Sequence, residues 1–192
     1  MSNLFRMTAY GVIVSKRDLR SYTDRPLSEE TLEKILRAGR MSGSSRNRQP
    51  WHFIVVRDRS RLRELAGFGR YTPHLPRAAA VVCVVVDGLG AMFDAGRCAQ
   101  NLMLAAWTLG VASCPATLHR EKEARTFLAV PDGHVIATVI AFGYPHPGGR
   151  GAVERTALRI LAGRGRRPLA SMASLERYGA SLPLPHAKMA GI

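Results

Sequence analysis

No other stretch limits the choice of fold as strongly as residues 78–86. These nine residues are all Ala, Val or Cys, and they show no alternation of apolar and polar positions. A strand with one face in water shows such an alternation, whereas a strand covered on both faces does not. The run therefore predicts a central strand with a packed layer on each side, which Asp87 and Gly88 end in a turn.

Other helices and strands are predicted on either side of this central strand. Residues 28–40 carry the signals of a helix start: Ser28 can cap the first turn, and two glutamates follow at the positive end of the helix dipole. Leu27 can pack on Leu32 across that turn. Further helices are expected at residues 4–14, 60–66, 91–109 and 121–128, and further strands at 53–56, within 111–119 and at 135–142.

The helix expected at residues 91–109 is the longest and is apolar on nearly every side. A helix of this kind needs cover over most of its surface, either in a core or from a second subunit. Gln100 and Asn101 lie near its middle. They are either core amides with backbone partners or contacts at an interface between subunits.

The chain of 192 residues carries a net charge of +14, from 24 Arg and 4 Lys against 14 acidic residues. A chain of this length is expected to form one domain with a full core. Its charge is compatible with nucleic acid, with an acidic small molecule or with codon bias toward Arg. A nucleic-acid-binding protein gathers its charge into a stripe or motif, whereas Arg occurs here in every segment. We therefore favour a phosphate-bearing ligand together with codon bias.

Cysteine spacing and the length of the apolar runs indicate the compartment. Cys83, Cys98 and Cys114 are odd in number and show no CxxC spacing, so they predict buried thiols rather than disulfides or a metal site. The longest apolar runs are shorter than ten residues, whereas a membrane span needs about 18. No basic and then apolar leader opens the sequence, so a cytoplasmic protein is expected.

Residues 44–53 make an unusual connection between a predicted helix and a predicted strand. The connection takes about ten residues where 2–6 are usual. Its short polar side chains belong to Ser44, Ser45 and Asn47. Pro50 favours an extended conformation at Gln49 and so directs the chain into the strand. This is either a capped surface loop whose tryptophan fills the core, or a loop whose polar groups bind a ligand.

Two further stretches are candidates for ligand binding. Residues 16–22 contain three cations in five positions: Lys16, Arg17 and Arg20. These form either a solvated turn or a clamp in which guanidinium groups bind the oxygens of a phosphate. Asp18 fits such a clamp only if it orients an Arg. Residues 67–76 have no period and predict a loop, which in one interpretation lies over a ligand.

Four segments taken together resemble the FMN-dependent nitroreductase family, in its order and at its spacing. They are residues 16–22, 44–53, 100–110, and 141–145 followed by 164–169. The sequence Ser-Ser-Arg-Asn-Arg-Gln-Pro-Trp-His-Phe at 44–53 is the most specific of them. The resemblance spans about residues 5–180.

The resemblance implies an α+β fold with a central, mainly antiparallel sheet flanked by helices. It implies a single nitroreductase-like FMN-binding domain over residues 1–192. It also implies an intertwined homodimer, with one FMN in each of two interface sites. Residues from about 146 to 192 would form a C-terminal tail that wraps the partner subunit.

Carried over by position, the resemblance further implies a set of FMN-binding residues. Arg17, Asp18 and Arg20 would hold the phosphate, the ribityl chain and the pyrimidine edge, and Arg164 and Arg166 would close on the phosphate from the tail. Ser44, Ser45 and Asn47 would reach the isoalloxazine from the other subunit, and Gln49 of the same loop belongs to the set. Pro115, Thr117 and Leu118 would line the remaining flavin face. A cation at the N1/C2 carbonyl edge favours the anionic reduced flavin, and Arg20 is the candidate for it.

In an enzyme of this kind the flavin carries the chemistry, so neither a catalytic side chain nor a metal ligand is expected. NAD(P)H would deliver a hydride to flavin N5 and leave. A nitroaromatic, quinone or similar small-molecule acceptor would then enter the same pocket, which is a ping-pong mechanism. Neither a membrane nor nucleic acid is an expected partner.

Two departures from the family pattern leave alternatives open. Asp18 stands where a hydroxyl residue is common, and its neighbourhood resembles the branch that cleaves reduced flavin to make a vitamin B12 base. A flavin-destructase or dehalogenase reaction on the same fold is therefore one alternative. Thr117 and Leu118 replace an acidic residue and a glycine. From another class, the chain would be a non-catalytic module that binds flavin or nucleic acid.

Overall fold

The predicted central strand, β2 (Ala80–Val86), lies inside a four-stranded sheet of order β1-β2-β4-β3. The other strands are β1 (Trp51–Val56), β3 (Ala112–Ala116) and β4 (Val135–Gly143). Each neighbouring pair is antiparallel. The structure, a computed structural model, describes residues 8–147 and 166–183, and this sheet belongs to the first range. The expected α+β fold with a mainly antiparallel sheet is confirmed.

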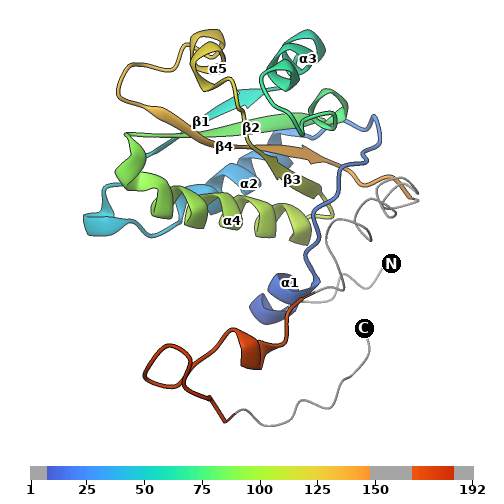
Figure 1. Ribbon diagram of the computed structural model, residues 1–192. Coiled ribbons are helices and arrows are strands. Elements are labelled where there is room, and N and C mark those ends of the chain that lie inside the picture. The colour runs from blue at the N-terminus through green and yellow to red at the C-terminus, as the bar shows by residue number, and fades with distance from the viewer. Residues whose placement is uncertain (1–7, 148–165, 184–192) are drawn as a thin grey trace. The chain divides into compact units, whose positions relative to one another are not determined.

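Helices cover both faces of the sheet, as the unbroken apolar run predicts. α2 (Glu29–Arg40) and α4 (Met92–Thr108) lie on one face, and α3 (Arg59–Gly67) and α5 (Glu121–Phe127) lie on the other (Figure 1). Successive β2 residues therefore enter different layers. Val82 and Val84 pack with α2 and α4, whereas Val81 and Val85 pack in the opposite cluster. All seven residues of β2 are buried.

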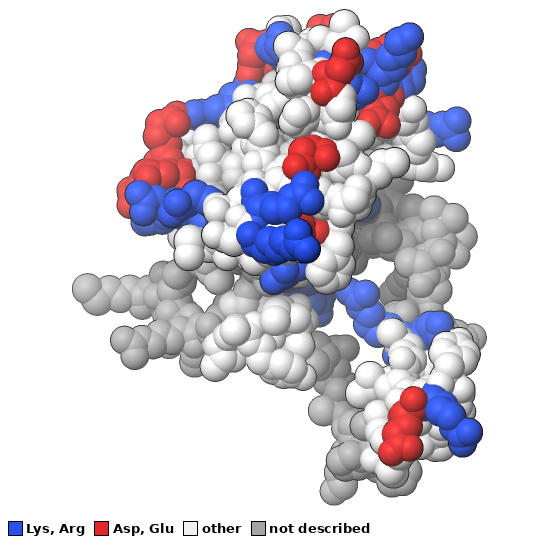
Figure 2. Space-filling model, turned by 90° about the vertical axis from the view of Figure 1, so that its left-hand side faces the viewer, with Lys and Arg blue, Asp and Glu red and all other residues white. Residues whose placement is uncertain are grey.

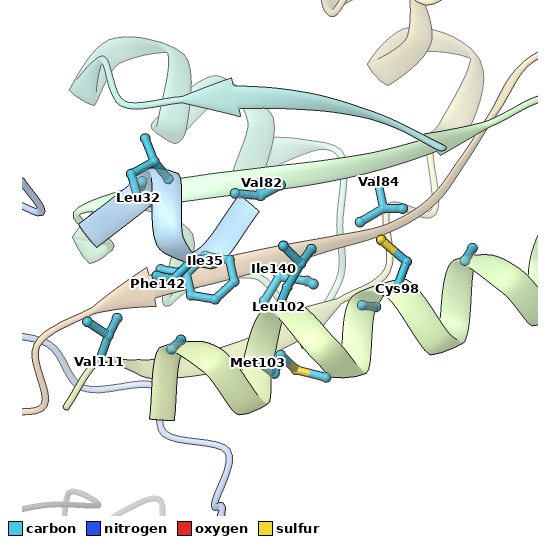
Figure 3. Packing of buried hydrophobic residues seen from close by; sticks show 14 of the residues in the cluster. Leu32, Ile35, Val82, Val84, Cys98, Leu102, Met103, Val111, Ile140 and Phe142 are labelled. Atoms are coloured by element: carbon cyan, nitrogen blue, oxygen red, sulfur yellow. The ribbon is translucent and has the colours of Figure 1, made fainter. Parts of the chain in front are cut away.

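Aliphatic side chains build the layer between the sheet and the helices α2 and α4. Ile35, Leu102 and Ile140 are fully buried there, and they point into the same space as Val82 and Phe142 (Figure 3). Burying one such side chain contributes roughly 1.5–3 kcal/mol. This layer holds α4 in place, and the first turn of α4 carries part of the candidate site.

α2 begins where its sequence signals predict. The Ser28 hydroxyl accepts a hydrogen bond from the Thr31 N–H at 3.2 Å, and both glutamates lie in the first turn. Near its other end α2 packs very closely on α4. A Cβ atom added at Gly39 would lie 2.6 Å from Leu102 Cδ2. Only glycine allows this separation between the two helices.

The first helix, α1 (Ala9–Ser15), is shorter than the predicted segment because residues 4 and 5 lie outside the described ranges. Only Val12 of its apolar residues is buried. Tyr10, Ile13 and Val14 are exposed. The described part of the chain therefore covers Val12 but not the other apolar residues of this helix.

One expected boundary needs correction, and the structure bears on two alternatives that the sequence left open. β1 begins at Trp51, two residues before the predicted start, because its ladder with β2 extends to the pair Trp51 and Val86. Trp51 is half-buried at the edge of the core and does not fill it. Gln100 is exposed, which excludes a core amide at that position, whereas Asn101 Nδ2 donates to Ser42 Oγ at 2.8 Å.

α4 agrees closely with the predicted range, and its N-terminal half has uncovered apolar side chains. Phe93 is 77% exposed, and Met92 is exposed beside it. Leu89, in the short 3-10 helix η3 (Leu89–Ala91) just before α4, is exposed as well. These exposed side chains do not lie in the core, and their cover by a second subunit stays a prediction.

The cysteines are buried, as predicted. Cys83, Cys98 and Cys114 are all free thiols in the interior. Burial disfavours the thiolate and raises the pKa of both Cys83 and Cys98 to about 12. These thiols are therefore unreactive at neutral pH.

The chain divides into two compact units, Met1–Gly151 and Ala152–Ile192. In the second unit the described residues contain η4 (Leu169–Ser171) and a bridge between Ser174 and Ser181. Leu169 and Tyr178 of this unit are exposed. That residues from about 146 onward wrap a partner stays a prediction. Among the described residues, no helix has the length and apolar character needed to cross a bilayer.

Candidate functional site

The segment that follows α1 runs along the edge of the sheet beside β3. Asp18 forms a parallel bridge with Ser113, and the Leu19 N–H donates to the Ser113 carbonyl at 3.2 Å. Residues two apart in an extended segment share a face, and Lys16 Nζ forms an ion pair with the Asp18 carboxylate. The Lys16 side chain is only 9% exposed, and its Nζ also lies 3.4 Å from Met103 Sδ. Asp18 therefore orients a lysine here.

Arg17 has a different environment from Lys16. Its guanidinium is exposed and donates to the Val14 carbonyl at 2.8 Å and to the Lys16 carbonyl at 3.0 Å. These bonds satisfy carbonyl groups at the end of α1. Lys16 is thus the more enclosed cation, although the FMN-binding set implied by the resemblance included only Arg17, Asp18 and Arg20 of this segment. The i, i+2 spacing of Lys16 and Asp18 was the signal that could have indicated it.

Arg20 lies near a buried histidine from the predicted loop at 67–76. His74, which precedes the short 3-10 helix η2 (Leu75–Arg77), is 3% exposed. Burial first, and the positive charge of Arg20 second, lower the pKa of His74 to about 4, while the Cys114 backbone opposes this shift. Within the described residues neither ring nitrogen makes a well-aligned hydrogen bond, and the buried Ser113 hydroxyl has none either.

The three residues predicted for the remaining flavin face lie at and beyond the end of β3. Pro115 is half-buried in the strand, and Thr117 is exposed just after it. Leu118 is buried in the core cluster under α3 and α5, so its side chain is committed to packing. The structure thus brings Pro115 and the segment at 17–20 together along one edge of the sheet.

The loop at 44–49 is held by a dense set of hydrogen bonds around the 3-10 helix η1 (Ser45–Asn47). The Gln49 N–H donates to Ser44 Oγ at 2.8 Å. The Ser45 N–H donates to Asp94 Oδ2, in the first turn of α4, at 3.3 Å. Arg48 pairs with Asp87 at 2.9 Å. Two carboxylates, Asp87 just after β2 and Asp94 in the first turn of α4, therefore hold this loop.

The backbone of the same loop is strained. Arg46, Asn47 and Gln49 have φ angles of 51°, 55° and 50°, which is the left-handed region that non-glycine residues rarely adopt. Each such residue costs of the order of 1 kcal/mol. Strain of this kind persists only where surrounding contacts impose it, and it is typical of functional loops.

Two grooves flank this loop. One of about 600 Å³ is lined by Gly43, Met92, Phe93, Gly96, Arg97, Gln100 and Asn101. The other, of about 500 Å³, runs between α2 and β1 and includes Gln49 and Trp51. Figure 2 views the molecule from the side on which the loop lies in Figure 1 and shows basic side chains beside acidic ones.

The loop at 44–49 and the segment at 17–20 lie at opposite corners of the sheet. Ser113 on β3 pairs with Phe142, which pairs with Ala80 at the start of β2. Trp51, which follows the loop, pairs with Val86 at the other end of β2. Six residues at about 3.3 Å and three strand spacings of about 4.8 Å separate Trp51, next to the loop, from Ser113, next to the segment, by about 25 Å. One chain cannot bring both groups to one small ligand.

For the two arginines predicted to bind FMN from the C-terminal tail, Arg164 and Arg166, the structure gives no position relative to the loop or to the segment at 17–20. Arg164 lies outside the described residues. Arg166 is exposed in the second unit, whose position relative to the first is not determined.

Comparison with known proteins identifies the family. The profile described as "Nitroreductase family" matches residues 13–75 and 72–144. The chain belongs to the nitroreductase family. The match includes the segments at 16–22 and 44–53 on which the resemblance depended.

Three nitroreductase-like relatives agree with this membership. A provisionally named NADH dehydrogenase/NAD(P)H nitroreductase from Archaeoglobus fulgidus is 35% identical over 145 residues, which are 70% of this chain and 83% of that protein. The NADPH-flavin oxidoreductase of Vibrio harveyi is 25% identical over 154 residues, 69% of this chain and 64% of that protein. A crystal structure from Parabacteroides distasonis, with the same provisional name as the archaeal protein, has a TM-score of 0.68 and 32% identity. It covers 71% of this chain and 86% of its own.

Proposed function

We propose that this chain is an FMN-dependent oxidoreductase that takes hydride from NAD(P)H and passes it, by a ping-pong mechanism, to a nitroaromatic, quinone or similar acceptor. The family match carries this proposal, because it includes the three segments of the first unit that hold the predicted FMN ligands. The names of the archaeal and Vibrio relatives support the donor and the flavin. When bound, FMN accepts a hydride from NAD(P)H and delivers it to the acceptor.

The residues beside β3 fit the phosphate and pyrimidine ends of FMN. A phosphate monoester carries close to two negative charges, and Lys16, Arg17 and Arg20 supply three positive ones within five positions. The Ser113 hydroxyl and the His74 ring, both buried without a well-aligned partner among the described residues, lie next to this segment. We assign Lys16 to the set beside Arg17 and Arg20, with Asp18 as the group that orients Lys16.

Two copies of the chain would complete the site. Trp51, next to the loop at 44–49, and Ser113, next to the segment at 17–20, are about 25 Å apart in one chain, so we assign the two groups of a site to different copies. Phe93 and Met92, which are exposed, and the groove floored by Gly96 offer an apolar contact surface close to the loop. This arrangement supports a homodimer with two sites, each made by both chains.

Arg20 has a specific role in this proposal. A cation at the N1/C2 carbonyl edge stabilises the reduced, anionic flavin, and each 1.4 kcal/mol of preference raises the two-electron potential by about 30 mV. Arg20→Gln is therefore expected to lower the midpoint potential of bound FMN and to weaken FMN binding. Arg63→Gln, an exposed arginine on α3, is the matched control and is expected to change neither quantity.

The decisive experiment is spectroscopic. Purified protein with FMN is expected to be yellow, to lose its flavin absorbance on anaerobic addition of NADH or NADPH, and to regain it when a quinone or nitroaromatic is added. Initial rates at several concentrations of donor and acceptor are expected to give the parallel lines of a ping-pong mechanism. Colourless protein that takes up no added FMN would exclude the proposal.

The same experiment separates the alternative reactions. Flavin-destructase activity predicts irreversible, oxygen-dependent loss of the flavin chromophore after reduction, and dehalogenation predicts release of halide. The feature that suggested these reactions was Asp18, and its carboxylate is engaged by Lys16.

A further inference from the structure

Arg46 occupies an unfavourable backbone position within the loop at 44–49. Its φ and ψ angles of 51° and 25° are left-handed, where a glycine or asparagine is far better suited than an arginine. Strained backbone positions are frequent at functional sites, so we examine what the Arg46 side chain could bind.

Hydrogen bonds on both sides of Arg46 impose this conformation. Asn47 N–H and Arg48 N–H donate to the carbonyls of Ser44 and Ser45 at 3.0 and 3.1 Å. The Asp94 carboxylate holds Ser45, and Asp87 holds Arg48. These bonds hold the loop backbone on either side of Arg46 in the absence of a ligand.

Arg46 also carries the charge that the loop does not neutralise. Arg48 is paired with Asp87 at 2.9 Å, and Arg97, next to the loop, is paired with Asp94 at 3.8 Å. Across residues 8–147 and 166–183, Arg46 makes no ion pair and its side chain is exposed. Within the described residues, one guanidinium without an ion-pair partner therefore remains exposed on the loop.

We propose that Arg46 selects the electron acceptor, by binding an acidic group on it, so that the preferred acceptors are aromatic compounds that carry a carboxylate or a similar anion. This inference rests on the proposed function, in which the loop of one copy covers the flavin of the other. Arg46 then stands at the mouth of the pocket that the acceptor enters. A guanidinium binds two carboxylate oxygens at once, which favours a planar anion over a neutral isostere.

The size of the effect follows from the exposure of the site. A charge-assisted hydrogen bond is stronger when shielded from water than when exposed, and the Arg46 side chain is exposed. We therefore expect kcat/KM for an anionic acceptor to exceed that for a neutral analogue by about tenfold. This preference is expected to decrease as salt is added, because exposed charges are screened.

The test compares para-nitrobenzoate with para-nitrobenzyl alcohol as acceptors for the FMN-loaded enzyme, with NAD(P)H saturating. The ratio of their kcat/KM values is the readout, because it cancels changes in flavin content. Arg46→Gln and Arg46→Gly are both expected to reduce the ratio about tenfold, although glycine also relieves the backbone strain. Arg46→Lys is expected to keep part of the ratio, and Arg63→Gln on α3 to keep all of it.

Two results would overturn the inference. One is a wild-type enzyme that shows no preference for the anionic acceptor. The other is a preference that persists unchanged in Arg46→Gln, or that falls equally in Arg63→Gln. If FMN binds and the neutral acceptor turns over in these cases, only the role of Arg46 fails. A chain that binds no FMN removes the proposed function and this inference together.

Discussion

A single buried histidine makes the stability of the fold depend on pH. His74 is 3% exposed, and burial followed by the Arg20 charge lowers its pKa from the ordinary 6.5 to about 4. Below pH 6.5 the unfolded chain binds a proton that the folded chain does not. The free energy of unfolding is therefore expected to fall between about pH 6.5 and pH 4, by at most about 3 kcal/mol. Urea unfolding at a series of pH values measures this.

The control for this prediction uses two variants. His74→Gln removes the titrating group and is expected to abolish that part of the pH dependence. His52→Gln, an exposed histidine on β1, is expected to keep it. An unchanged slope in His74→Gln would show that other groups cause the pH dependence.

At the scale of the elements, the packing of α2 on α4 depends on one glycine. An added Cβ at Gly39 would lie 2.6 Å from Leu102 Cδ2 and 3.0 Å from Phe53 Cζ. Gly39→Ala gains about 1 kcal/mol in helix propensity, but overpacking costs typically 1–3 kcal/mol. We expect net destabilisation of up to about 2 kcal/mol, measured from the midpoint of chemical unfolding.

Gly90→Ala provides the comparison, because nothing lies within 4 Å of an added Cβ at that position. Its unfolding midpoint is expected to stay close to that of the wild type. A Gly39→Ala variant more stable than the wild type would mean that α2 can move away from α4 at little cost.

At the scale of the whole molecule, the proposed site needs two copies of the chain. The exposed apolar side chains at the start of α4 are the surface that we expect to contact the second copy. Phe93 is 77% exposed, and the groove beside it is lined by Gly96. Phe93→Asp places a charge on this surface and is expected to reduce dimerisation and FMN content together. Analytical ultracentrifugation and flavin absorbance measure the two quantities.

Tyr71, which is 79% exposed, provides a matched aromatic position away from α4. Tyr71→Asp is expected to leave the oligomeric state unchanged. A Phe93→Asp variant that is monomeric but still binds FMN with wild-type affinity would contradict a site shared between chains.

Local patterns predicted most of the elements correctly. The unbroken apolar run at β2 predicted burial on both faces, and the Ser28 cap predicted the start of α2. These predictions succeed because capping bonds and strand faces involve residues close together in the chain. The start of β1 was missed, because the pairing of Trp51 with Val86 depends on a partner distant in sequence.

In the candidate site, too, some features follow from the sequence and others depend on contacts between distant segments. Its residue types follow from the sequence, since polar loop residues and clustered cations occur at a recognisable spacing in the chain. Burial of Lys16 against Met103, the proximity of Arg20 and His74, and the placement of two ligand groups at opposite corners required the tertiary structure. Each of these contacts joins segments tens of residues apart, and the order of strands in the sheet decides whether such segments meet.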